Sequence, residues 1–180
     1  FSRTELVTVG AVMMNKIPKG NKVAIITHAG GPAVMLTDTL SENGLNVPHI
    51  SGEKADSLLK ELYKGSSVSN PLDFLATGTA LQLEKIIDAC ENDFDVDSMA
   101  VIFGNPGLTK VFDVYETLFK KIEECKKPIF PVLPSIVNAK DEIEKFKELG
   151  GICFPDEVQF GNAFGKVMGQ HGSLYNTQLP

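Results

Sequence analysis

Several familiar signals are missing from this chain of 180 residues. Acidic side chains outnumber basic ones and the formal net charge is −6, so no excess of positive charge is available to hold nucleic acid. No apolar run approaches the length of a membrane span, and no signal peptide is recognised. These absences argue against nucleic acid and membranes as partners.

Cysteine is scarce, and its pattern is informative. Cys90, Cys125 and Cys153 lie far apart and have none of the spacings of metal ligands. An odd, scattered set of thiols is typical of a reduced cytoplasmic protein in which each cysteine is a small core residue. We therefore expect a cytoplasmic protein without a metal site.

Two common nucleotide-binding fingerprints are also absent. The sequence contains neither G-x-G-x-x-G nor G-x-x-x-x-G-K-[ST], so a nicotinamide site or a Walker-type ATP site has no support. Flavin mononucleotide would need a Ser/Thr-rich phosphate-binding loop, which the first glycine-rich turn does not provide. We expect no cofactor in this domain.

What the sequence does contain is a regular alternation of apolar strands and amphipathic helices. Strands are expected at residues 23–27, 45–50, 98–103, 129–133 and 152–154, and helices at 4–16, 33–42, 53–63, 80–92, 110–125, 138–149 and 156–168. This alternation predicts an α/β fold with right-handed crossovers, arranged as a flavodoxin-like three-layer α/β/α domain. The five strands would form a parallel sheet in the order 2-1-3-4-5.

The expected domain organisation has three parts. Residues 1–20 form a leading helix and linker, residues 21–171 the flavodoxin-like domain, and residues 172–180 a flexible polar tail. A composition of 43% hydrophobic and 22% charged residues suits one such domain with a substantial core. The chain begins with Phe1 rather than Met, which favours a fragment of a longer polypeptide or a processed product.

The most informative segment runs from residue 23 to residue 33, where an apolar strand enters Ala29-Gly30-Gly31. Pro32 suits the first position of a helix that continues from Ala33. The free N–H groups and the dipole of such a helix end attract anions. The alternative is that the glycines only make a tight turn.

A second turn rich in glycine and proline follows the strand at 98–103 and spans Gly104-Asn105-Pro106-Gly107. In the order 2-1-3-4-5 the switch point lies between strands 1 and 3. The loops that follow these two strands therefore line one crevice, which adds Gly104 and Asn105 to the candidate binding residues.

Four segments together resemble one family. Beginning with "KGNKVAIITHAGGPAVMLTDTLSENGL", they cover residues 19–45, 69–89, 94–109 and 126–135 and are similar in order and spacing to NDP-forming acyl-CoA synthetases. The chain also resembles the carboxy-terminal domain of the succinyl-CoA synthetase β-subunit. Three features depart from the family pattern: His28 replaces Asn, Ala33 replaces Gly, and Ala76-Thr77 replaces a Gly-Asp pair.

The resemblance implies a reaction that converts acyl-CoA, ADP and phosphate to acid, CoA and ATP, or the reverse. It implies a parent protein that uses ATP/ADP, Mg and CoA, with phosphate carried on a histidine of another domain. This chain would be the second flavodoxin-like, succinyl-CoA ligase-like domain. It would help to hold the phosphohistidine loop at a helix N-terminus, next to the CoA-binding, phosphohistidine and ATP-grasp domains.

Single residues leave alternatives open. His28 could carry phosphate covalently, hydrogen-bond to a ligand or a neighbouring domain, or be a plain loop residue. Hydrogen bonding is favoured over the covalent role, because the family's phosphohistidine sits in an "HTG"-type motif that this chain lacks. Asn70 and Asp73 flank Pro71. Local turn chemistry is favoured for both, and the alternative is a role at a domain contact or phosphate site.

The chain offers no nucleophile–base pair, so we expect no catalytic residue here and no activity from this domain alone. The leading hypothesis is a domain of an NDP-forming acyl-CoA synthetase. A non-catalytic binding or scaffold module with the same fold is the second, and a free-standing flavodoxin-like electron carrier is the third. The candidate phosphate-binding or domain-contact residues are His28, Gly30, Gly31, Pro32, Ala33, Asn70, Asp73, Gly104 and Asn105.

Overall fold

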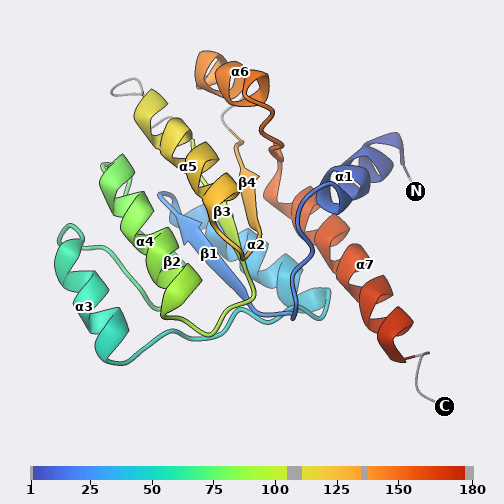
Figure 1. Cartoon of the computed structure of the whole chain (residues 1–180), viewed down its shortest axis with the longest axis horizontal. Helices are drawn as coiled ribbons and strands as arrows, with labels where there is room; N and C mark the ends of the chain where they lie inside the picture. The colour runs from blue at the N-terminus through green and yellow to red at the C-terminus, as the bar shows by residue number, and fades with distance from the viewer. Residues whose placement is uncertain (1, 105–110, 135–137, 177–180) are drawn as a thin grey trace.

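The computed structural model describes residues 2–104, 111–134 and 138–176. The helices are α1 (Arg3–Met13), α2 (Gly30–Glu42), α3 (Glu53–Glu61), α4 (Ala80–Asn92), α5 (Phe112–Glu124), α6 (Lys140–Glu148) and α7 (Glu157–Asn176). The strands are β1 (Val23–Thr27), β2 (Leu72–Asp73), β3 (Ser98–Ile102) and β4 (Ile129–Val132). The strands lie at the centre of the molecule with helices on both sides, as Figure 1 shows.

The sheet is parallel throughout, and its order is β2-β1-β3-β4. Strands β1 and β3 pair along their whole length, from Val23 opposite Ser98 to Thr27 opposite Ile102. The predicted adjacency of the first and third strands at the switch point is therefore confirmed, and their carboxyl ends lie side by side.

The expected five-stranded sheet in the order 2-1-3-4-5 is wrong in strand number and in the identity of its edge. The segment 45–50 makes a single parallel bridge, Asn46 with Lys22, and the edge strand is Leu72–Asp73 instead. The reason is Pro48, which has no N–H to donate to the next carbonyl of β1. That carbonyl, on Val23, accepts a hydrogen bond from the side chain of Asn70 instead.

The expected fifth strand, at residues 152–154, is also reduced to one bridge. Phe154 pairs with Val132: its N–H donates to the carbonyl of Pro131 at 2.8 Å, and its own carbonyl accepts from the N–H of Leu133 at 2.7 Å. Pro131 has no N–H that could extend the ladder toward residue 152. On the other side, Asp156 turns the chain into α7 by accepting a hydrogen bond from the N–H of Gln159 at 2.7 Å.

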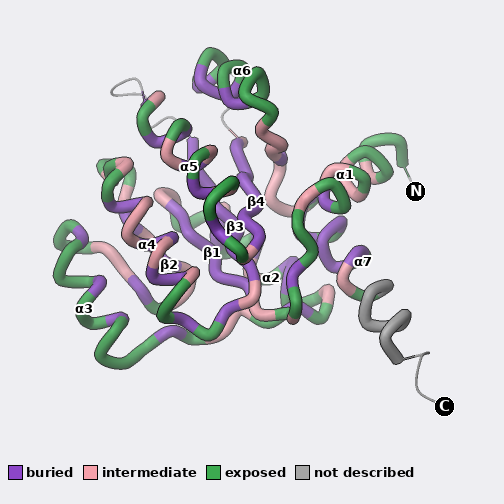
Figure 2. The backbone as a smooth tube through the Cα atoms, viewed as in Figure 1, coloured by how far each residue is buried: buried purple, intermediate pink, exposed green. Residues whose placement is uncertain are grey.

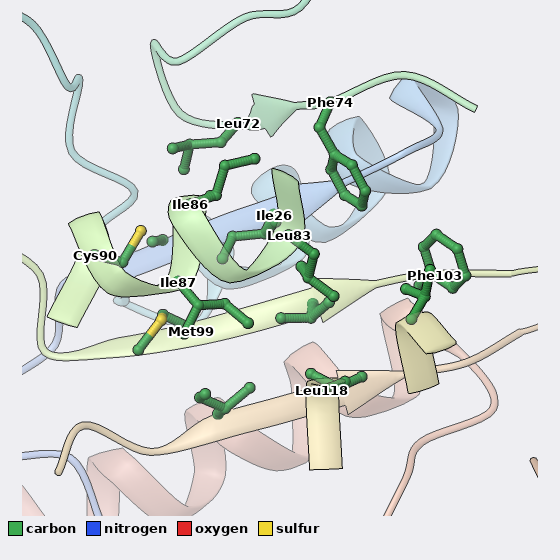
Figure 3. Close-up of a cluster of buried hydrophobic side chains, with 14 of the residues drawn as sticks. Ile26, Leu72, Phe74, Leu83, Ile86, Ile87, Cys90, Met99, Phe103 and Leu118 are labelled. Atoms are coloured by element: carbon green, nitrogen blue, oxygen red, sulfur yellow. The ribbon is translucent and has the colours of Figure 1, made fainter. Parts of the chain in front are cut away.

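Two apolar layers cover the sheet. Ala24, Ile26, Met99 and Val101 face a cluster built with α3, α4, α5 and α6, and the alternate strand residues face α1, α2 and α7. Strands β1, β3 and β4 are buried along their length (Figure 2), and in β2 Leu72 is buried and Asp73 is half-buried. In Figure 3, α4 lays Leu83, Ile86, Ile87 and Cys90 against the sheet. The described helices thus cover both faces of the sheet.

Most helix positions agree with the sequence pattern. Helix α4 has the predicted bounds, because Thr79 and Gln82 form a reciprocal capping box at its start. Helix α7 continues to Asn176, past the expected end near residue 168. In the part of the chain that the structure describes, no helix is long and apolar enough to cross a membrane.

Candidate functional site

Helix α2 begins directly at the pair of glycines that follows β1. The prediction of a glycine turn with Pro32 at the first helical position is wrong. Gly30 and Gly31 are the first two residues of α2, and Pro32 is the third. The first N–H groups of a helix have no intrahelical partner, so a proline is tolerated anywhere in this first turn.

The entry into α2 is fixed without a side-chain cap. Ala29 is the N-cap, and its side chain makes no capping hydrogen bond. The hydroxyl of buried Thr27 holds Ala29 instead: it accepts from the N–H of Ala29 at 2.9 Å and donates to its carbonyl oxygen at 2.8 Å. Gly30 and Gly31 therefore start a rigidly placed helix whose first N–H groups are not covered by a capping side chain.

The two glycines are not required by the packing of the described residues. A Cβ atom added at Gly30 or at Gly31 would meet nothing within 4 Å, and neither residue has a positive φ. Glycine in a helix destabilises it by roughly 0.5–1 kcal/mol relative to alanine. What the glycines do provide is an exposed backbone that an outside group can approach closely.

Other helices begin at the same edge of the sheet, because parallel βα units place the helix N-termini next to the carboxyl ends of the strands. The N-caps of α5 and α6, Val111 and Ala139, also make no side-chain capping bond. Each such end carries about half a unit of positive charge. The first turns of α5 and α6 also carry Asp113, Asp141 and Glu142, whose negative charges oppose this effect, whereas the first turn of α2 carries no acidic residue.

His28 stands between β1 and α2 and is half-buried. Its ring packs on Phe103, with ring centroids 4.7 Å apart, and its Nδ1 lies 3.3 Å from the carbonyl oxygen of Ile102. Burial lowers the pKa of His28 below its usual value, against the opposing effects of the Ile102 hydrogen bond and the negative charge of Asp73. Burial therefore favours the neutral form of the imidazole.

The side chains of Asn70 and Asp73 make different kinds of hydrogen bond, the first between distant backbone segments and the second within its own turn. The side chain of Asn70 bridges two backbone segments: Oδ1 accepts from the N–H of Ile25 at 2.9 Å, and Nδ2 donates to the carbonyls of Val23 and Pro48, each at 3.0 Å. Asp73 makes the local bond expected of turn chemistry, accepting from the N–H of Leu75 at 2.8 Å.

The structure brings part of the predicted set together. His28, Gly30, Gly31 and Asp73 follow or end strands β1 and β2, and buried Gly104 follows β3, so all five lie at the carboxyl edge. The other predicted residues lie elsewhere or have other contacts. Asn70 lies beside the amino-terminal half of β1, Ala33 is buried in the core, Pro32 is half-buried in α2, and Asn105 lies outside the described residues.

Sequence reasoning missed two residues that shape this edge. Thr27 was predicted only as the end of an apolar strand, and Phe103 only as part of another. A hydroxyl at the last position of a buried strand, two residues before a helix N-cap, was the available signal for Thr27. No comparable signal marks Phe103, whose contact with His28 joins distant parts of the chain.

The hollows found on the described surface lie away from the candidate residues. Three of these hollows have volumes of about 200, 490 and 390 Å³, and none of the three is lined by His28, Gly30 or Gly31. The exposed backbone of Gly30 and Gly31 can present N–H groups to an anion.

No protein-family model matches the chain. Curated relatives do match. The chain is 29% identical over 150 residues to the ADP-forming acetate–CoA ligase II subunit alpha of Pyrococcus furiosus, covering 81% of this chain and 32% of that subunit. It is 26% identical over 163 residues to the ADP-forming acetate–CoA ligase II of Archaeoglobus fulgidus, covering 87% of this chain and 24% of that protein. The chain thus spans a third or less of these two relatives.

Solved structures share the fold. An apo dinucleotide-forming acetyl-coenzyme A synthetase 1 of Ca. Korarchaeum cryptofilum superposes with a TM-score of 0.85 at 18% identity, covering 99% of this chain and 40% of that one. The same enzyme in complex with phosphate and ADP gives a TM-score of 0.84. The resemblance to the NDP-forming acyl-CoA synthetase family is thereby confirmed, since both the sequence and the fold of this chain are similar to those of a domain from that family.

Proposed function

We propose that this chain acts as a phosphate-holding domain of an NDP-forming acyl-CoA synthetase. The observation that carries the proposal is the start of α2, where two exposed glycines that the described packing does not require begin a helix without a side-chain cap. This arrangement suits the close approach of a phosphoryl group to backbone N–H donors. The similar synthetase from Ca. Korarchaeum cryptofilum is known in complex with phosphate and ADP.

In the proposed mechanism, the phosphoryl group arrives on a histidine of another domain. The first N–H groups of α2 donate hydrogen bonds to its oxygens, and the helix dipole stabilises its negative charge. Thr27 keeps these donors in place through its two bonds to Ala29. Preorganised donors of this kind are worth about 10²–10³-fold in rate in other enzymes.

The rest of the reaction belongs to other parts of the parent protein. The ATP/ADP, Mg and CoA sites would lie in CoA-binding, phosphohistidine and ATP-grasp domains of the same protein or of a partner subunit. The length of the matches fits that division, because the chain spans 32% of one curated relative and 24% of another. The isolated domain is therefore expected to bind phosphate weakly and to catalyse nothing.

A phosphate titration of the isotopically labelled chain tests this proposal. The amide signals of Gly30, Gly31 and Ala33 should shift more than signals elsewhere, and Gly31→Asp should abolish those shifts by like-charge repulsion and blocked approach. Gly10→Asp is the matched control, because Gly10 is also exposed in a helix with open space around it. Shifts at the α2 start no larger than those elsewhere would remove the support for this site.

A further inference from the structure

The outer side of α1 is apolar, whereas the outer sides of α5 and α6 are charged. Every exposed position within α5 and α6 holds Asp, Glu or Lys. On α1, Leu6, Val7 and Met13 are 58%, 67% and 60% exposed, and Met14 at its C-cap is 78% exposed. Their spacing along the chain puts these four side chains on one side of the helix. We call this set the α1 stripe.

The opposite side of α1 is already used by the fold. Val12 is fully buried, and α1 packs along α7, beside which it lies in Figure 1. The carboxylate of Glu5 pairs with Lys166 of α7, and no charged residue follows Glu5 until Lys16. A helix that is apolar all round is typically covered all round. The described residues cover one side of α1, which leaves the stripe for a partner.

A hollow of about 200 Å³ extends the stripe at its carboxyl end, where Met14 forms part of the lining. Most of the side chains that line it are apolar, among them Phe119 and Ile122 of α5 and Ile152. Sites for small molecules commonly measure about 300–1,000 Å³, so this hollow is small for a cofactor. It suits a single apolar side chain, and an anchor of this kind dominates the binding energy at many protein interfaces.

The size of this surface decides what kind of partner fits it. Helix α1 has 11 residues and is therefore about 16 Å long, and a helix is roughly 10 Å wide, so the stripe offers on the order of 200 Å². A stable complex between separate proteins buries roughly 800 Å² on each partner. This surface alone would therefore hold a second copy or another free protein too weakly. A segment of the same polypeptide needs far less contact, because its effective concentration reaches roughly the millimolar range.

We propose that the stripe and the hollow are covered by an apolar, uncharged segment of the same parent polypeptide that lies outside residues 1–180, with one of its side chains in the hollow. The segment is uncharged because a charge pressed onto the stripe would lose water without gaining an ionic partner. The match to the synthetase of Ca. Korarchaeum cryptofilum covers 99% of this chain but only 40% of that one. This inference rests on one part of the proposed function, that the chain is a domain of a longer protein, and not on the phosphate site.

Methionine oxidation tests the proposal, because Met13 reports on the stripe and Met14 also on the hollow. Hydrogen peroxide is added to this chain and to the full-length parent, and the sulfoxides are measured by fragment-ion mass spectrometry. Both methionines should oxidise at least roughly tenfold more slowly in the parent, since oxidation follows exposure. Met99, which is fully buried in β3, is the internal control and should stay reduced in both proteins. The rates should not depend on protein concentration.

A charge placed in the stripe should remove the cover. In the parent, Val7→Glu should raise the oxidation rates of Met13 and Met14 toward those in this chain. In this chain alone the same change should alter neither the rates nor the thermal midpoint, because Val7 is exposed. Leu81→Glu is the matched control and should change neither rate in the parent. Leu81 on α4 is 60% exposed, but charged Glu84 and Lys85 are its helical neighbours, so it belongs to no apolar stripe.

Three results would overturn the proposal. The first is oxidation of Met13 and Met14 in the parent at the rates seen in this chain, and the second is protection in the parent that Val7→Glu leaves in place. The third is protection that appears in this chain as its concentration rises, since the cover would then be a second copy. None of these results bears on the phosphate site, whose own failure would be seen as absent shifts at Gly30 and Gly31 in the phosphate titration.

Discussion

The side chain of Asn70 makes hydrogen bonds to the backbone of β1 and of Pro48, in the place where strand-to-strand bonds would otherwise form. Its amide oxygen and nitrogen meet the N–H of Ile25 and the carbonyls of Val23 and Pro48, which is the work a neighbouring strand would do. The side chain thus repairs the gap that Pro48 creates in the ladder. A residue that looked like a loop or site residue is part of the sheet edge.

Replacing Asn70 with alanine should therefore destabilise the domain. The change leaves the buried N–H of Ile25 and two carbonyls without their partner, at a cost of about 1–3 kcal/mol for a buried group left unpaired. Urea unfolding measures the loss. Asn92→Ala is the control, since Asn92 makes only an exposed bond to the carbonyl of Asp88. Equal effects of the two changes would contradict the bridging role.

At the scale of single elements, α2 combines a well-buried face with a first turn that gains little from its own sequence. Leu36 and Leu40 are fully buried against the sheet, while Gly30 and Gly31 contribute no side-chain contacts. The helix is held by its later turns and by the Thr27 bonds at its entry. In its first turn, Ala33 is buried in the core, whereas Gly30 and Gly31 are exposed and add no side-chain packing.

Gly30→Ala and Gly31→Ala should separate stability from binding. Each added methyl group enters open space and reduces the freedom of the unfolded chain, so each change should stabilise the domain by about 0.4–1 kcal/mol. The same methyl groups stand where a phosphate would approach the backbone and should weaken its binding. Thermal unfolding and the phosphate titration are the two measurements.

Gly10→Ala in α1 should stabilise the chain comparably without affecting the anion, because this glycine also has open space around it and lies in another helix. If alanine at Gly30 or Gly31 destabilised the domain, the packing of the folded chain would require glycine at that position. Unchanged phosphate shifts in either variant would mean that the anion does not approach that residue closely.

At the scale of the whole molecule, the proposed anion site at the start of α2 belongs to an acidic chain with a net charge of −6. The N-terminus of α2, whose first turn carries no acidic residue, is a local source of positive potential that the formal charges do not include. The chain spans 32% of one curated relative and 24% of another, so much of each relative lies outside the region matched here.

In the full-length parent protein, Gly30→Val should lower acyl-CoA synthetase turnover by at least roughly tenfold, because the isopropyl group blocks the approach to N–H donors of the kind worth 10²–10³-fold elsewhere. His28→Asn should retain much of the turnover, since it restores the residue of the family pattern. Steady-state turnover with acyl-CoA, ADP and phosphate is the measurement. Full turnover in Gly30→Val would rule out a contribution of α2 to phosphoryl transfer.

The sequence alone determined the elements whose signals are local. The bounds of α4 followed from its capping box and its helical spacing of apolar residues, and the adjacency of β1 and β3 followed from the βα alternation. The gathering of His28 and the two glycines at the carboxyl edge followed from the same alternation. These features depend on residues close together in the chain or on the general handedness of parallel sheets.

Only the tertiary structure decided the features that join distant residues. Asn70 reaches backbone 45 and 22 residues away, and the carbonyl that orients His28 is 74 residues further along the chain. The apolar run at 45–50 has the composition of a strand, but its pairing with β1 stops at Pro48, which has no N–H to donate. The side chain of Asn70 supplies the next hydrogen bond to β1 instead. A buried N–H or carbonyl group can pair with backbone or with a side chain. Which of the two it pairs with depends on which distant segments are neighbours in the folded chain, and a local sequence pattern does not contain that information.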